Sequence, residues 1–213
     1  MFGLFRKKAP PSAVRVESDL VYVDDASRAD AVASAVRAHL EAGRRVALLT
    51  PFRGHIPSVR EQLTARGVGT YALDLSYRDA APPPDAVYLL DGASVPLLLS
   101  RSAAAPPMAF VQVERHPLRA HDLAVEAALE AHAREHRLRV YLSLDDGLMT
   151  LFDASGTVKK LTVALEIPMG EPIEHAMVTS SIENAQAKLA KKVRAEVPAD
   201  TFAAWREKNL AAR

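Results

Sequence analysis

Short β-rich runs alternate with helical patterns between Asp19 and Leu144, and this alternation restricts the chain to a small set of folds. Strands separated by helices are typical of βαβ units, in which the strands are parallel and the helices cover the sheet. The run Val46–Leu49 is continuously apolar, which indicates a strand that is buried on both faces. The sequence therefore predicts an α/β fold built on a parallel sheet.

The individual elements follow from apolar periodicity and from the positions of Gly and Pro. Strands are expected at Leu20–Val23, Arg45–Thr50, Thr70–Leu75, Ala86–Leu90, Met108–Glu114 and Leu138–Leu144. Helices are expected at Ser27–Ala42, Ile56–Arg66, Leu118–His136, Glu174–Val197 and Thr201–Ala212, and Ala93–Ser100 is short and either helical or irregular. We divide the chain into a flexible N-terminal tail at 1–17, a sheet domain at 18–168 and a C-terminal helical extension at 169–213.

Composition excludes several classes of function. The chain has 27 basic and 26 acidic residues, so no overall charge attracts it to nucleic acid, and only 6% of its residues are aromatic. It has no cysteine, and no apolar run reaches the ~20 residues of a membrane span. These features predict a cytoplasmic protein. Phe2, Leu4 and Phe5 precede a short basic run and form either a frayed tail or a weak docking peptide for a partner or a membrane surface.

Three segments carry a resemblance to a known family. Tyr141–Met149 reads YLSLDDGLM, Gly170–His175 reads GEPIEH, and Ile182–Gln186 reads IENAQ. In this order they resemble the bacterial protein-translocation ATPase SecA, where its second motor domain ends and its long scaffold helix begins. Upstream, Glu114–His116 resembles the family's Glu-Arg-His. The likeness covers roughly Asp19–Val193, and it implies a RecA-like, helicase C-terminal type of domain followed by the start of the scaffold helix.

The resemblance also implies an ATP site that this sequence does not keep. On this alignment the family's ATP-contacting arginines fall at Ala128 and Ala131, its glutamine at Ala124, and its glycines at Ala127 and Glu130. Loss of an arginine finger typically costs several orders of magnitude in rate. No phosphate-loop motif G-x-x-x-x-G-K-[ST] occurs in the chain, and no cofactor is expected. We therefore predict a stand-alone pseudo-ATPase that binds protein partners; the alternative is a subunit that completes a split ATP site with another chain.

A second alternative is a metallo-hydrolase. His132, Glu135 and His136 spell H-x-x-E-H, in which two histidines share a helix face and the glutamate serves as a base. A solvated helix face with chance spacing is the simpler interpretation, so no metal ligand is expected. Asp74 and Asp91 follow strands, at the edge where open α/β sheets bind ligands, and they are either a residual site or ordinary strand-end acids.

The C-terminal extension carries an apolar stripe with helical spacing. Its members are Val178, Ile182, Ala185, Leu189 and Val193, with Phe202 and Trp205 further along the chain. Two alternatives stay open. The stripe either folds back on its own sheet domain, or it forms an interaction surface for a protein partner or a second copy of the chain.

Overall fold

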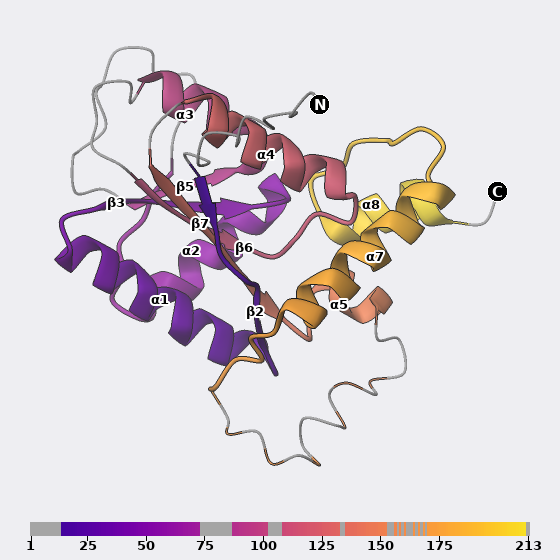
Figure 1. The fold of residues 1–213 in the computed structure, drawn as a ribbon, viewed down its shortest axis with the longest axis horizontal. Coiled ribbons are helices and arrows are strands. Elements are labelled where there is room, and N and C mark those ends of the chain that lie inside the picture. Colours follow the sequence, from indigo (N-terminus) through magenta and orange to yellow (C-terminus); the bar gives the residue numbers. More distant parts are fainter. Residues whose placement is uncertain are drawn as a thin grey trace, which may run out of the picture.

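The computed structural model describes residues 14–72, 87–101, 108–132, 135–152 and 170–211, together with 156, 158, 160, 164, 166 and 168. Within these residues a seven-stranded parallel sheet runs in the order β1-β7-β6-β3-β5-β4, and β2 pairs with a second stretch of β7 (Figure 1). The strands are β1 (Val14–Val16), β2 (Leu20–Tyr22), β3 (Arg45–Thr50), β4 (Tyr71–Ala72), β5 (Val87–Asp91), β6 (Met108–Val113) and β7 (His136–Ser143). The prediction of a parallel α/β fold is confirmed.

Helices cover both faces of this sheet. They are α1 (Asp25–Glu41), α2 (Ile56–Thr64), α3 (Val95–Arg101), α4 (Arg119–Ala131), α5 (Gly147–Phe152), α7 (Ala176–Lys192) and α8 (Phe202–Leu210), with single 3₁₀ turns η1 (Arg53–His55) and η2 (Gly92–Ser94). In Figure 1, α1 lies on the opposite side of the sheet from α3 and α4. Several helices begin at a side chain that satisfies a free backbone amide: Asp24 accepts from the Ser27 amide of α1 at 2.7 Å.

The strand β3 shows why the sheet needs cover on both sides. Val46 and Leu48 pack into one core with α1 and α2, whereas Ala47 and Leu49 pack into the opposite core with α3 and α4. All four side chains are fully buried. Successive side chains of a strand point to opposite faces, so a strand without polar alternation requires two apolar layers.

The helix predicted at Leu118–His136 is too long. In the structure α4 ends at Ala131, and His136 is the first residue of β7. His136 pairs with Val14 of β1, and its ring is buried edge-on against Phe110. Alanine-rich sequence favours helix by only a fraction of a kcal/mol per residue, so strand pairing and burial override this local preference.

The predicted N-terminal tail is also too long, because Val14–Val16 forms the strand β1. Val14 is buried in the core beneath α3 and α4, and β1 pairs in parallel with residues 136–138 of β7. Three residues are too few to show a period, so only the distant partner strand identifies this strand. Residues 1–13, with the predicted docking residues Phe2, Leu4 and Phe5, lie outside the described residues, as does Asp74.

The helical extension predicted at 169–213 packs on the sheet itself. Ile173 and Val21 of β2 exchange two backbone hydrogen bonds, at 2.8 and 3.1 Å. Ile182 of α7 is fully buried in a core with strand residues that include Val140. Helix α7 ends at Lys192, five residues before the predicted limit, and Val193 is extended. The C-terminal residues therefore complete the core of the sheet domain.

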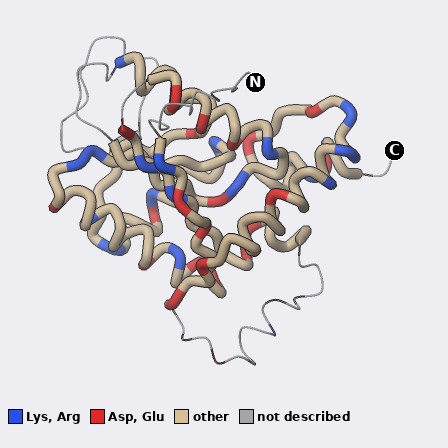
Figure 2. The backbone as a smooth tube through the Cα atoms, in the orientation of Figure 1, with Lys and Arg blue, Asp and Glu red and all other residues tan. Residues whose placement is uncertain are grey.

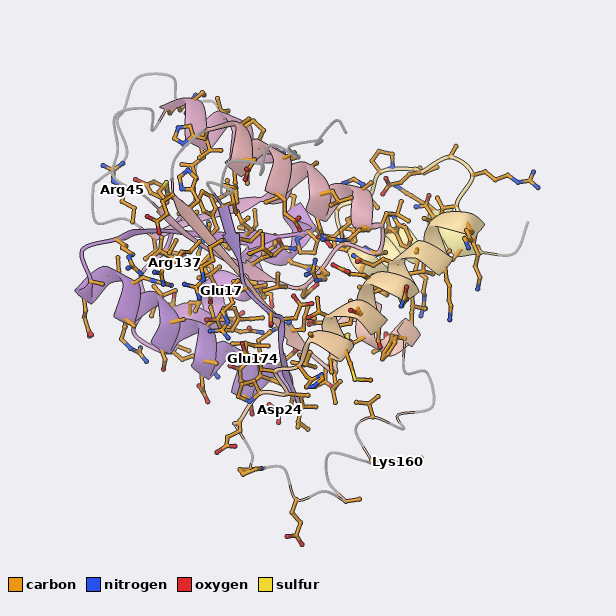
Figure 3. The ribbon with its side chains drawn as sticks, viewed as in Figure 1. Glu17, Asp24, Arg45, Arg137, Lys160 and Glu174 are labelled. Carbon is orange, nitrogen blue, oxygen red and sulfur yellow. The ribbon has the colours of Figure 1, made fainter. Side chains whose placement is uncertain are left out.

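Ion pairs also join the residues just before α7 to the strand β7. The guanidinium of Arg139 on β7 lies 2.5 Å from Glu174 and 3.4 Å from Glu17. Figure 3 shows the labelled Glu17 and Glu174 close together beside the sheet. These groups are partly exposed, so we expect the pairs to contribute little stability.

Candidate functional site

A pocket of about 370 Å³ lies at the carboxyl ends of the central strands. Its lining includes residues at the ends of three strands: Thr50 of β3, Asp91 of β5 and Gln112 of β6. The first turns of α4 form one wall, and residues from Glu196 to Trp205 form the other. Ligands of open α/β sheets bind in the crevice outside the carboxyl ends of the strands, so this pocket is the candidate site.

A buried charge network forms the base of this region. The Arg115 guanidinium donates to both carboxylate oxygens of Asp19, at 2.7 and 2.9 Å, and to Asp122 at 3.1 Å. The side-chain amides of Gln112 and Gln186 also donate to Asp122, at 3.0 and 2.8 Å. Burial opposes the charge of Arg115, but the bonds and charges of Asp19 and Asp122 outweigh it and raise the pKa of the guanidinium. The network ties β6, α4 and α7 to the N-terminal strands.

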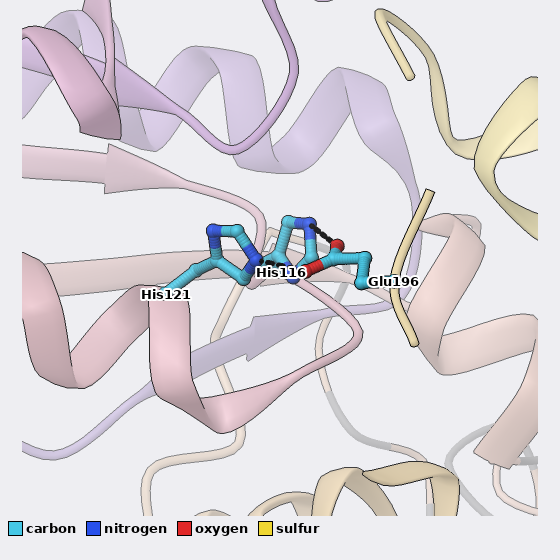
Figure 4. A group of neighbouring side chains, drawn as sticks. All are labelled: His116, His121 and Glu196. Carbon is cyan, nitrogen blue, oxygen red and sulfur yellow. Dashed lines mark hydrogen bonds and ion pairs between the residues drawn. The ribbon is translucent and has the colours of Figure 1, made fainter. Parts of the chain in front are cut away.

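Next to this network, two imidazole rings share one carboxylate (Figure 4). The rings of His116 and His121 lie 3.7 Å apart between centroids. Glu196 lies 3.5 Å from Nε2 of His116 and 2.7 Å from Nε2 of His121. The indole of Trp205 donates to the same carboxylate at 2.8 Å. His116, His121 and Glu196 form the group of three potential metal ligands found in the described part of the chain. Their donor atoms lie within 4.8 Å of one another.

The environment sets the protonation of this cluster. Burial and the neighbouring His121 lower the pKa of His116 to about 4, so its ring is neutral near pH 7. The Leu118 amide donates to Nδ1 of His116 at 3.1 Å, so the neutral ring carries its proton on Nε2, towards Glu196. Burial raises the pKa of Glu196, but hydrogen bonds from His121 and Trp205 outweigh it, and the net shift is downward.

The Glu-Arg-His segment sends its three side chains to three different partners. Arg115 and His116 contact the groups described above. The Glu114 carboxylate lies 3.1 Å from Nδ1 of His55 and 3.9 Å from the guanidinium of Arg28. Glu114 has a φ of 72°, a left-handed conformation that residues other than Gly rarely adopt. Such a backbone costs about 1–3 kcal/mol and persists only where the surroundings hold it. The segment thus connects α1, the turn after β3, α4 and the residues before α8 at the carboxyl end of β6.

The positions that the predicted alignment assigns to the ATP-site motif of SecA have different surroundings. Ala124 lines the pocket, Ala128 packs against the core beneath α3 and α4, and Ala131 is exposed at the end of α4. Ala127 and Glu130 are exposed as well. Of these predicted positions, the structure therefore brings Ala124 to the pocket.

The H-x-x-E-H motif does not form the geometry of a helical zinc site. His132 caps α4 and His136 lies in β7, so the two histidines do not share a helix face as predicted. Their rings do meet, with Nδ1 of His132 2.9 Å from Nε2 of His136. Glu135 between them is exposed. The reason is the early end of α4, which places the second histidine in the sheet.

The apolar stripe packs mainly on its own domain, the first of the two alternatives. Ile182 and Trp205 are fully buried, Val178 and Leu189 pack against the core around β2 and β7, and Val193, Leu189 and Phe202 pack around Trp205. Part of the stripe stays accessible in a groove of about 310 Å³ between α5 and α7, which is lined by Leu148, Leu151, Phe152, Ser181, Ala185, Lys188, Leu189 and Lys192.

The sequence predicted one acid of the pocket, Asp91, but not Glu196 or its contacts with His116 and His121. Asp91 was expected at a strand end, and it does line the pocket, where it accepts from the Ser94 amide at 2.9 Å and lies 3.5 Å from Arg53. Glu196 gave no signal, because it lies in an irregular segment 75 residues from His121. The spacing of His116 and His121 was the one available hint.

The fold and the site define an α/β domain with a parallel sheet and a pocket at the carboxyl ends of its strands. In sequence, the chain is similar to the protein translocase subunit SecA. It is 39% identical over 83 residues to SecA of Aromatoleum aromaticum, a match that covers 39% of this chain and 9% of that protein. It is 41% identical over 86 residues to SecA of Legionella pneumophila strain Corby, covering 40% and 10%. The resemblance to SecA predicted from the sequence is confirmed over this part of the chain.

The chain thus matches about a tenth of the length of these relatives. No family model matches it. Among solved structures, the C-terminal part of the Fun30 ATPase domain superimposes with a TM-score of 0.45 at 9% identity, covering 77% of this chain and 54% of that one. None of the helices in the described ranges is long and apolar enough to cross a membrane.

Proposed function

We propose that this chain is a cytoplasmic SecA-like domain that does not hydrolyse ATP and that acts in protein translocation by binding protein partners. The similarity to SecA supports the link to translocation. The main support for the proposed absence of ATPase activity is the chemistry of the pocket at the carboxyl ends of the strands. This pocket has alanine at position 124 and more acidic than basic groups in its lining.

The charges in the pocket disfavour a nucleoside triphosphate. Among the described residues that line it are four carboxylates, from Asp91, Asp122, Glu196 and Asp200, and one guanidinium, from Arg53. That guanidinium lies 3.5 Å from Asp91, and Asp122 pairs with Arg115, so Glu196 and Asp200 remain in the described lining as acids without a guanidinium partner. Enzymes that transfer phosphoryl groups neutralise the phosphates with Lys, Arg and metal ions, and like charges repel at close range.

The chain's own C-terminal segment occupies the adjoining edge of the sheet. The amide of Gly54, after β3, donates to the Asp200 carbonyl at 2.7 Å. A Cβ atom at Gly54 would meet that carbonyl oxygen at 2.6 Å, and one at Gly147 would clash with the ring of Phe202. Both glycines therefore allow residues 200–202 to approach the strand ends closely. The C-terminal segment therefore occupies part of the edge of the sheet at which ligands of open α/β sheets bind.

We predict that the purified protein neither binds ATP tightly nor hydrolyses it. Titration calorimetry with ATP and Mg²⁺ should show no saturable heat up to millimolar nucleotide, and phosphate release should not exceed the blank. A SecA protein serves as the positive control. A micromolar dissociation constant would contradict the proposal and would favour the split-ATPase alternative, in which another chain supplies the missing cations.

The groove between α5 and α7 is the surface that fits a protein partner best. Phe152 is 39% exposed at one side of it, and Ala185 and Leu189 of the predicted stripe form the other side. Lys188 and Lys192 line the groove, and Lys191 and Lys192 lie in the last turn of α7. Figure 2 colours basic residues blue along the backbone, and blue segments lie near the C-terminal end. An apolar groove bordered by lysines fits an amphipathic helix with acidic flanks.

Two charge substitutions separate packing from binding at this groove. Leu189→Glu should lower the free energy of unfolding by about 2–3 kcal/mol, because Leu189 contacts two cores. Phe152→Glu should lower it by less than about 1 kcal/mol, because much of that ring is already in water. Denaturant unfolding measures both.

Phe152→Glu also tests the partner surface, because it should leave the fold intact. In affinity purification from native lysate with quantitative mass spectrometry, Phe152→Glu should lose the partners that the wild-type chain recovers, and light scattering should show any self-association weakened. Met177→Glu is the matched control, because Met177 is 72% exposed at the other end of α7. Unchanged recovery with Phe152→Glu would exclude this groove as the binding surface.

A further inference from the structure

We propose that His116, His121 and Glu196 form a binding site for one divalent transition-metal ion, with zinc as the expected metal. The site differs from the H-x-x-E-H motif in every residue, and it is independent of the proposed function. It was not expected from the sequence, because its third member lies 75 residues beyond its second.

The donor atoms already lie close to the arrangement that a metal ion imposes. Zinc binds imidazole nitrogen and carboxylate oxygen at about 2.0–2.2 Å, so tetrahedral donors lie roughly 3.3–3.6 Å apart. Glu196 is 3.5 Å from Nε2 of His116 and 2.7 Å from Nε2 of His121, and all three donors lie within 4.8 Å of one another. Movements of about an ångström in side chains are enough to place an ion between them.

The neighbours of the carboxylate support a metal site. The Trp205 indole donates to one Glu196 oxygen at 2.8 Å, which fixes the orientation of the carboxylate. Metal-bound carboxylates commonly accept a hydrogen bond of this kind from an outer group. All three candidate ligands also line the 370 Å³ pocket, so the remaining coordination positions face a space that can hold water or a ligand.

The donor set selects the class of metal. Two imidazoles and one carboxylate suit zinc and its neighbours in the first transition row, whereas magnesium and calcium prefer oxygen ligands alone. The chain has no cysteine, so thiolates offer no competing zinc site. Three protein ligands with an open fourth position is the ligand number of many accessible zinc sites.

Binding requires one local change at His116. A neutral ring that accepts the Leu118 amide on Nδ1 carries its proton on Nε2, where the metal would bind. The metal-bound ring must move this proton to Nδ1 and turn away from the amide, so one backbone hydrogen bond is lost. We therefore expect an affinity in the micromolar range and a shift of the Leu118 amide resonance when metal binds.

The metal would join two parts of the chain that are distant in sequence. His116 follows β6 and His121 lies in the first turns of α4, whereas Glu196 belongs to the segment between α7 and α8. An ion that binds only the folded chain stabilises it by mass action. Zinc should therefore raise the melting temperature of the protein and slow proteolysis of the C-terminal segment.

The test uses full-length protein without a polyhistidine tag, treated with chelator and dialysed. Calorimetric titration with zinc chloride should give about one equivalent, and cobalt(II) should show the visible absorption of a low-coordinate nitrogen and oxygen site. His121→Ala and Glu196→Gln should each weaken binding at least tenfold or so. His121 is about half exposed, so its removal should leave the fold intact.

His132→Ala is the matched control, because His132 also lies beside another histidine but outside the cluster. It should bind zinc like the wild type. Two results would overturn the proposal. One is wild-type protein that binds no zinc at 100 µM, on the order of a hundred times the expected dissociation constant. The other is binding that His121→Ala and Glu196→Gln leave unchanged while His132→Ala abolishes it.

Discussion

Arg115→Ala should lower the free energy of unfolding by about 3–5 kcal/mol, one of the two largest effects expected for a single substitution in this chain. The guanidinium makes three hydrogen bonds to Asp19 and Asp122, and all three side chains are buried. Removal of one partner leaves two carboxylates in the interior without their counter-charge, which costs more than the ion pairs contribute. Urea unfolding followed by circular dichroism measures the change.

Arg139→Ala is the control for Arg115→Ala. Arg139 also pairs with two carboxylates, those of Glu17 and Glu174, but these groups are partly exposed, so water screens the interaction. The loss should stay below about 1 kcal/mol. Equal effects of the two substitutions would mean that the Arg115 network is hydrated in solution.

Trp205→Ala should lower the free energy of unfolding by about 3–5 kcal/mol, the usual range for removal of a buried tryptophan. The side chain is fully buried between Phe202, Phe52 and Leu118, and its indole nitrogen is bonded to Glu196. The cavity left behind would release α8 from the ends of β3 and β7, so limited proteolysis should cut within residues 194–201 before the sheet unfolds.

Leu123→Ala provides the comparison for this prediction. Leu123 lies on α4 and is 49% exposed, so truncation removes little buried surface and should change stability by less than about 0.5 kcal/mol. If Trp205→Ala were as mild as Leu123→Ala, the C-terminal segment would not be docked in solution as the structure shows it.

The fold was predictable from the sequence because its signals are local. The apolar run of β3 requires two layers of cover, and the positions of Gly43 and Gly67 after α1 and α2 indicate where those helices end. The predictions from sequence are wrong where a strand that is distant in sequence determines the local structure. The strand β1 and the strand start at His136 exist because each pairs with the other, and no window of local sequence contains both.

The candidate site was predictable only in part, for the same reason. Arg115 and His116 stand out in the sequence because they belong to a segment that resembles SecA. The charge that balances Arg115 comes from Asp19, 96 residues earlier, and the carboxylate that faces His116 comes from Glu196, 80 residues later. Neither acid lies in a periodic pattern, so spacing alone does not connect them to the site. The stripe on α7 was recognised, but amphipathicity does not say whether a domain or a partner covers it.

The position of β7 in the sheet has a consequence for how the chain folds as it is made. The strands β1 and β2 leave the ribosome first, yet both pair with β7, whose residues follow about 120 positions later. At about 5–20 residues per second, they wait roughly 6–24 seconds for their partner. β6 also pairs with β7, and its residues come about 28 positions earlier, so β6 has an open edge for roughly the last 1–6 seconds of this interval. An unpaired strand edge invites wrong pairing, so the interval before β7 emerges is when a nascent chain of this protein most needs a chaperone.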